Sequence, residues 1–281
     1  MYSYSYRSKS NGAPILSRVE IEDITEGILK EYQEELLTQP QEIDIEHLAF
    51  KYLHAHEDIQ YLSPNGIYLG ATFYKKSNIV TYIPETGKAG LVEVQPRTIV
   101  IDSRLGESGQ EHRYRFTFGH EVAHLSLPHE DYFCSHPIQL AARSAGVIAC
   151  RDVGGRLAGS DTSKWDDVDW MEWQADSFSS AILMPKKAVR ILMNEIEREY
   201  EDDGRGWRNY IKIQRMIEIF NISDEAAEIR LKYLGMLDAV FDDSLEEADA
   251  NEKEPLTGYT RHRSRKYYTA KKIGERLGIW N

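Results

Sequence analysis

The sequence contains little cysteine: among its 281 residues only Cys134 and Cys150 carry a thiol. Two cysteines are too few for a disulfide framework, which excludes the small disulfide-stapled secreted proteins and favours a reducing compartment. The N-terminal stretch MYSYSYRSKSNGAP has no apolar core of signal-peptide length. No apolar run approaches the roughly 18 residues that a membrane-spanning helix requires. These absences predict a cytoplasmic protein without a membrane partner.

Positive charge is also in the minority, since 34 Lys and Arg residues face 46 Asp and Glu residues, for a net charge of −12. This balance argues against broad, non-specific binding to nucleic acid or to anionic membranes, although it leaves a local basic patch open. Hydrophobic residues make up 41% and charged residues 28% of the chain, as in globular proteins. The length is enough for one large domain or two smaller ones with an ample core.

The first segments predict a tail followed by helices. Residues 1–16 are rich in Ser, Tyr, Asn and Gly without periodicity, which predicts a mobile N-terminal tail. Ser17 and Glu20 have the spacing of a capping box, and the apolar pattern after them predicts a helix that ends near Pro40.

A second helix is expected to begin around Asp44, with His54 and His56 near its end. From Tyr61 to Asp102 the pattern changes to strands, in the runs GIYLGATFY, NIVTYI, LVEV and RTIVID. These runs are rich in β-branched and aromatic residues and are separated by turn signals. Short strands followed by a histidine-bearing helix predict an α+β fold, in which a small mixed sheet packs on that helix.

The histidine-bearing helix, expected over about 111–127, contains His120-Glu121-Val122-Ala123-His124. Residues four apart share one face of a helix, so His120 and His124 can hold one Zn²⁺ through neutral ring nitrogens. Glu121 projects near the metal and can take a proton from a water molecule there. The alternative is a buried helix with two hydrogen-bonded histidines. A third ligand elsewhere in the chain would decide between the two.

The segment WMEWQADSFSSAILMPKKAV supplies a candidate for that ligand on another amphipathic helix, which ends near Pro185. Glu172 and Asp176 lie four apart and therefore share a face. A catalytic zinc takes three protein ligands and keeps one open position, so Glu172 would complete a His/His/Glu set. Asp176 would accept a hydrogen bond from the second ring nitrogen of a ligating histidine, which fixes its tautomer. The alternative is a pair of solvated carboxylates on a surface helix.

The long connection over 128–165 has mixed character. Its part QLAARSAGVIACR resembles a short helix and RDVGGRLAGSDTS a glycine-rich loop, which is typical either of a partner-binding loop or of a surface insertion without a role. A second zinc site is conceivable there, but the spacing of its candidate ligands fits no standard pattern. These candidates are His129, Cys134, His136 and Cys150.

Two of these segments together resemble a known family. FTFGHEVAHLSLPH followed by EWQADSFSSAILMP is similar to the ImmA/IrrE family of metallopeptidases, whose members combine an HExxH helix with a helix reading E-x-x-A-[ND]-x-F-x-x-x-L-L-M-P. The resemblance continues upstream in IDIEHLAFKYL and TIVID, and downstream in FNISDEAAEIRLKYLGML. It covers roughly residues 44–237.

The resemblance implies a zincin-like domain that acts as a site-specific protease. Its implied substrate is a helix-turn-helix repressor, whose cleavage relieves repression of a mobile element, a phage or a stress response. Carried over to this sequence, the zinc ligands would be His120, His124 and Glu172, and the catalytic base would be Glu121.

The domain plan that follows has four parts: a tail over 1–16, a zincin-like domain over 17–185, a helical subdomain over 186–237, and an acidic linker with a basic tail over 238–281. The helical subdomain could pass for a helix-turn-helix, but it is not basic enough to predict DNA binding. A different function stays open, namely a zinc-stabilised module that sequesters a repressor or binds DNA without proteolysis. The presence of Glu121 argues for catalysis, because a structural zinc site needs no base. The sequence specifies no oligomeric state.

Overall fold

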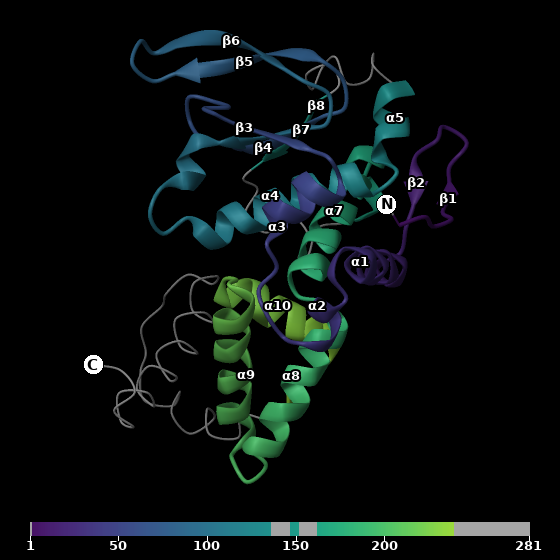
Figure 1. Ribbon diagram of the computed structural model, residues 1–281, viewed down its shortest axis with the longest axis vertical. Coiled ribbons are helices and arrows are strands. Elements are labelled where there is room, and N and C mark those ends of the chain that lie inside the picture. The colour runs from purple at the N-terminus through teal and green to yellow at the C-terminus, as the bar shows by residue number, and fades with distance from the viewer. Residues whose placement is uncertain (1, 136–146, 152–161, 239–281) are drawn as a thin grey trace, which may run out of the picture.

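The computed structural model describes residues 2–135, 147–151 and 162–238, and it has the mixed α+β composition that the sequence predicts (Figure 1). Its central sheet contains four strands in the order β3 (His56–Gln60), β7 (Thr98–Asp102), β4 (Tyr68–Phe73) and β8 (Val147–Arg151). β3 runs parallel to β7, whereas β4 is antiparallel to both β7 and β8. Every residue of β7 is buried, as expected for a central strand that is covered on both faces.

The predicted strands do not all join one sheet. β5 (Ser77–Ile83) and β6 (Lys88–Val94) form a separate hairpin. This hairpin packs on the central sheet through a small apolar cluster made by Ala71, Phe73, Ile79, Val94 and Val100. The end predicted for the helix from Asp44 was wrong, because its last helical turn ends at Tyr52 and His56 begins β3. The segment HEDIQ has little strand character of its own, and it becomes a strand because it pairs with the buried β7.

The two helices that carry the metal motifs lie together on the other side of the sheet (Figure 1). α4 (Glu111–Ser126) contacts β4 and β7, and α7 (Asp167–Leu183) packs along α4. A shorter helix, α5 (His129–Ser135), follows α4 directly. Short 3₁₀ turns precede α4 at Ser103–Gly106 and α7 at Thr162–Lys164.

The N-terminal helices begin as the sequence predicts. Ser17 and Glu20 form the predicted capping box at the start of α1 (Arg18–Gln33), and α2 (Glu35–Thr38) continues the same segment. Asp44 caps α3 (Ile45–His47), which passes into a π-helical turn over Leu48–Tyr52.

Residues 2–16 are packed on the protein, in contrast to the mobile tail predicted for residues 1–16. They contain a short hairpin of β1 (Arg7–Ser8) and β2 (Pro14–Ile15). The Tyr4 hydroxyl donates to the carbonyl of Ser126, 2.8 Å away, and Lys9 forms an ion pair with Asp167. The segment is therefore attached to the ends of both α4 and α7, and the prediction failed because its partners lie more than 100 residues away.

The remaining helices form the lower part of Figure 1 and are α8 (Lys186–Glu199), α9 (Arg205–Phe220) and α10 (Asp224–Leu234). Their apolar side chains belong to the same buried cluster as those of α1, α4 and α7. Inside this cluster Arg230 donates to both carboxylate oxygens of Glu22 and to the carbonyl of Met184. Among the described helices, none is both long and apolar enough to cross a membrane.

Two predicted segments are described only in part. Of the predicted helix QLAARSAGVIACR, the last five residues form β8 instead, because Val147 and Ile148 join the open edge of β4. Residues 136–146 and 152–161 lie outside the described residues. The same holds for 239–281, which include nearly all of the predicted acidic linker and basic tail.

Candidate metal centre

The pentapeptide of α4 lies in the interior of the protein. His120 is 2% exposed, and Glu121 and His124 are both 0% exposed. Phe118, Val122 and Ala123 are also fully buried, so the helix is surrounded by apolar groups. A buried setting excludes competing ligands and strengthens electrostatic interactions at the site.

The fold brings the candidate third ligand to the two histidines. Glu172 on α7 places one carboxylate oxygen 3.3 Å from His120 Nε2 and the other 3.8 Å from His124 Nε2. The two Nε2 atoms lie 3.1 Å apart. The Glu172 side chain is 29% exposed, so this cluster opens to solvent on the side of α7.

These donors fit a zinc ion by type and by spacing. Two neutral imidazoles and one carboxylate are the ligand set of many catalytic zinc sites. Ligands bound at about 2.0–2.2 Å to a tetrahedral zinc lie about 3.3–3.6 Å from one another. The observed separations of 3.1, 3.3 and 3.8 Å surround that range. The three groups could therefore hold one ion without a large rearrangement, and all their ligand atoms lie within 4.8 Å of one another.

Asp176 lies on the far side of the first histidine. Its Oδ1 is 2.8 Å from His120 Nδ1, the ring nitrogen that points away from His124. A carboxylate oxygen accepts there, so His120 carries its proton on Nδ1 and directs the lone pair of Nε2 toward Glu172.

The second histidine is supported by groups that the sequence did not single out for this role. His124 Nδ1 is 2.8 Å from His129 Nδ1, and His129 Nε2 is 3.0 Å from Gln174 Oε1. Burial lowers the pKa of His129 to about 4 and holds the pKa of His124 well below its usual value. His129 thus lies beside His124. A second zinc site stays untested, because His136 and the side chain of Cys150 lie outside the described residues.

Glu121 contacts the strand that packs on α4. The Thr72 hydroxyl donates to Glu121 Oε2 at 2.6 Å. A methyl group at Gly70 would lie only 2.7 Å from Glu121 Oε1, so glycine is needed for this close approach. Both residues belong to β4. The one signal in the sequence was a glycine inside a run of strand formers.

One family model matches residues 75–232 of the chain, that of the IrrE N-terminal-like domain, Peptidase M78. The chain belongs to this family. The match implies a metallopeptidase-like domain, and it contains α4 and α7 with His120, Glu121, His124 and Glu172. Gly70 and Thr72 precede residues 75–232, the part of the chain that the family model matches. No curated protein is similar enough to this chain to count as a match.

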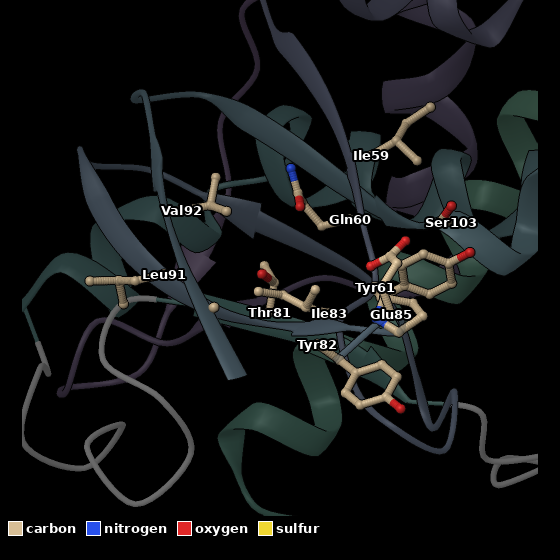
Figure 2. A pocket seen from close by; sticks show the side chains of 12 residues that line it. Ile59, Gln60, Tyr61, Thr81, Tyr82, Ile83, Glu85, Leu91, Val92 and Ser103 are labelled. Carbon is tan, nitrogen blue, oxygen red and sulfur yellow. The ribbon is translucent and has the colours of Figure 1, made fainter. Parts of the chain in front are cut away.

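A hollow of about 420 Å³ lies elsewhere in the M78 protein, between the end of β3 and the hairpin of β5 and β6 (Figure 2). In Figure 2 the side chains of Gln60, Thr81 and Val92 lie around it. It is on the hairpin side of the central sheet, whereas α4 covers the other side. None of its lining residues belongs to the metal cluster, so the hollow is separate from the candidate metal centre.

Proposed function

We propose that this protein is a zinc-dependent endopeptidase with His120, His124 and Glu172 as metal ligands and Glu121 as the general base. The observation that supports this most directly is the convergence of three metal-binding groups at ligand spacing, with a fully buried carboxylate next to them in the chain. All four residues lie inside the part of the chain that matches a metallopeptidase-like family.

The proposed chemistry is hydrolysis of a peptide bond by water. A zinc ion held by the three ligands would polarise the scissile carbonyl and lower the pKa of a water molecule toward about 7. Glu121 accepts the proton of the attacking water and passes it to the leaving amine. Thr72 assists by holding Glu121 Oε2 through the 2.6 Å hydrogen bond, which fixes the plane of the carboxylate.

The proposed substrate is a protein, namely a helix-turn-helix repressor whose cleavage relieves repression. A scissile segment would be bound as an extended strand beside the sheet, because main-chain hydrogen bonds then align its carbonyl with the metal. β4 carries Gly70 and Thr72 against Glu121, and β8 pairs with its other edge. An extended substrate would therefore add beyond β8 or take the place of β8.

The charges on α9 and α10 do not favour DNA binding by these helices. The basic side chains of this unit that form ion pairs with acidic residues are Arg208, Lys212, Arg215, Arg230 and Lys232. Lys212 and Arg230 are also buried, at 1% exposure each. Paired and buried charges offer little to a phosphate backbone. A repressor would then be recognised through direct protein contacts, and not because both proteins bind the same DNA.

The test is cleavage of a small helix-turn-helix repressor, taken from a gene beside this one, by zinc-loaded protein. The wild type should produce two fragments of defined mass. Glu121→Gln keeps the shape of the side chain and an acceptor for Thr72, but it cannot take a proton. We expect Glu121→Gln to bind zinc like the wild type and to cleave about 10²- to 10⁴-fold more slowly.

Glu107→Gln is the matched control, because it makes the same chemical change at an exposed position outside the cluster. It should cleave at the wild-type rate. Cleavage by Glu121→Gln at that rate would contradict the proposed role of Glu121. A wild-type protein that binds zinc and the repressor but leaves the repressor intact would instead favour the sequestering module.

A further inference from the structure

A chain of buried hydrogen-bonding groups runs from His124 to the main chain of the N-terminal hairpin. It passes from His124 to His129 over 2.8 Å and from His129 to Gln174 over 3.0 Å, and Gln174 Nε2 donates to the carbonyl of Pro14 at 3.1 Å. The side chains of His124 and His129 are 0% exposed and that of Gln174 is 2% exposed. This chain is called the Pro14 relay below.

The direction of each hydrogen bond in the Pro14 relay follows from its last member. A carbonyl oxygen can only accept, so the amide nitrogen of Gln174 must face Pro14 and the amide oxygen must face His129. Because that oxygen also only accepts, His129 Nε2 must carry a proton. In neutral His129 the other nitrogen, Nδ1, is then an acceptor, and His124 Nδ1 must donate to it.

These hydrogen bonds determine whether Nε2 of His124, the nitrogen that faces the metal cluster, carries a proton. With its proton on Nδ1, neutral His124 has a lone pair on Nε2, which lies 3.1 Å from His120 Nε2 and 3.8 Å from a Glu172 oxygen. The opposite tautomer would place a proton there, and a metal ion could bind only after that proton had moved. Both histidines are fully buried, and burial away from water favours their neutral forms.

We infer that the Pro14 relay selects the Nδ1–H tautomer of His124, and that His129 is therefore a positioning residue for metal binding. His129 does not itself reach the metal cluster, because both of its nitrogens are engaged within the relay. The inference rests on the proposed function only in taking the cluster to bind zinc. The tautomers follow from the hydrogen bonds of the relay. They leave the lone pairs of His120 Nε2 and His124 Nε2 facing each other across 3.1 Å, an arrangement that a shared cation would stabilise.

The first test needs neither metal nor substrate. Long-range ¹H–¹⁵N spectra of zinc-free protein labelled on histidine report which ring nitrogen of each histidine carries its proton. We expect opposite tautomers, with Nδ1–H for His124 and Nε2–H for His129. Finding Nε2–H for His124, or Nδ1–H for His129, would overturn the inference.

The second test measures zinc affinity by competition with a chromophoric chelator. His129→Phe keeps a ring of apolar volume but offers no acceptor to His124, and it should weaken zinc binding about 10- to 100-fold. His129→Asn restores an acceptor near the position of Nδ1. It should bind zinc within about threefold of the wild type, well short of the loss expected for a broken outer-shell contact.

Ser126→Ala is the control for a general loss of packing. Ser126 is buried on α4 and donates to the carbonyl of Val122, so this variant loses one buried hydrogen bond without touching a histidine. Urea unfolding of the zinc-free proteins measures the stability of each variant separately. Ser126→Ala should lose stability and keep its zinc affinity.

Equal zinc affinities for His129→Phe and the wild type would contradict the inference, and so would equal losses for His129→Phe and His129→Asn. Should His129→Phe fail to fold, the spectra of the wild type still decide the tautomers. These outcomes are distinct from failure of the proposed function. A wild-type protein that cleaves nothing contradicts that function, whereas the tautomers and zinc affinities stay measurable.

Discussion

The two histidines of the candidate metal centre lie one helical turn apart on α4, yet they are supported in different ways. His120 meets a single carboxylate, Asp176, whose side chain is 37% exposed. His124 is the first member of the Pro14 relay, whose side chains are buried and neutral. Both supports draw on α7, since Gln174 and Asp176 lie two residues apart on that helix. One helix therefore supplies Glu172, the candidate third ligand, and a support for each of the two histidines.

The difference indicates that charge supports one histidine and that hydrogen-bond geometry supports the other. A carboxylate makes its histidine more basic and favours a bound cation, but its partial exposure allows salt to weaken it. The relay fixes a tautomer with neutral groups, which avoids the free-energy cost of another buried charge beside Glu121. We expect the Asp176 side to respond to salt and the relay side to respond to the loss of hydrogen-bond acceptors.

The largest effect is expected when both supports are removed together. His129→Phe and Asp176→Ala should each weaken zinc binding about 10- to 100-fold. Because the two side chains act on different histidines, the losses should multiply in the double variant, to about 10²- to 10⁴-fold. Chelator competition on the wild type, both single variants and the double variant measures this. A double variant that binds no more weakly than the weaker single variant would mean that the supports are not independent.

A moderate effect is expected from salt. Raising the concentration of a salt with a weakly zinc-binding anion from 0.1 to 1 M shortens the screening length from about 10 to 3 Å. The affinity ratio between the wild type and Asp176→Asn should then fall by about two- to fivefold, as for a partly exposed charge. The ratio between the wild type and His129→Phe should stay constant. Equal salt dependence of both ratios would remove the distinction between the two sides.

The smallest effect is expected in the N-terminal segment that carries Pro14. Tyr4→Phe removes the hydroxyl that donates to Ser126, and it should lower the free energy of unfolding by about 0.5–1.5 kcal/mol. Zinc affinity should not change, because Lys9 and Asn11 still attach the hairpin of Pro14 to Asp167. Urea unfolding and chelator competition measure the two quantities. Unchanged stability would contradict the docking of residues 2–16.

Local patterns in the sequence were sufficient to predict features that depend on neighbouring residues. Ser17 and Glu20 predicted their capping box, and the bounds predicted for the HExxH helix agree with α4 to within one residue. The pairing of His120 with His124 follows from helical spacing. Glu172 and Asp176 could be chosen because zinc chemistry calls for a third ligand and a support, and both lie near the histidines in the structure.

What the sequence could not predict depends on contacts between distant segments. Gln174 and Pro14 are 160 residues apart, and Thr72 lies 49 residues before Glu121, so no spacing rule connects them. His129 was considered only as a ligand of a second zinc site, because a histidine that supports another histidine has no sequence signature. β8 was predicted as part of a helix, since only the exposed edge of β4 makes a strand of it.

The central claim is that His120, His124 and Glu172 hold a single zinc ion. It is tested most directly by anomalous diffraction from crystals of the zinc-loaded protein, recorded on both sides of the zinc absorption edge. The account predicts one strong peak, about 2.0–2.2 Å from His120 Nε2, His124 Nε2 and a carboxylate oxygen of Glu172. A peak bound instead by His129 or Cys134, or no peak at this cluster, would contradict it.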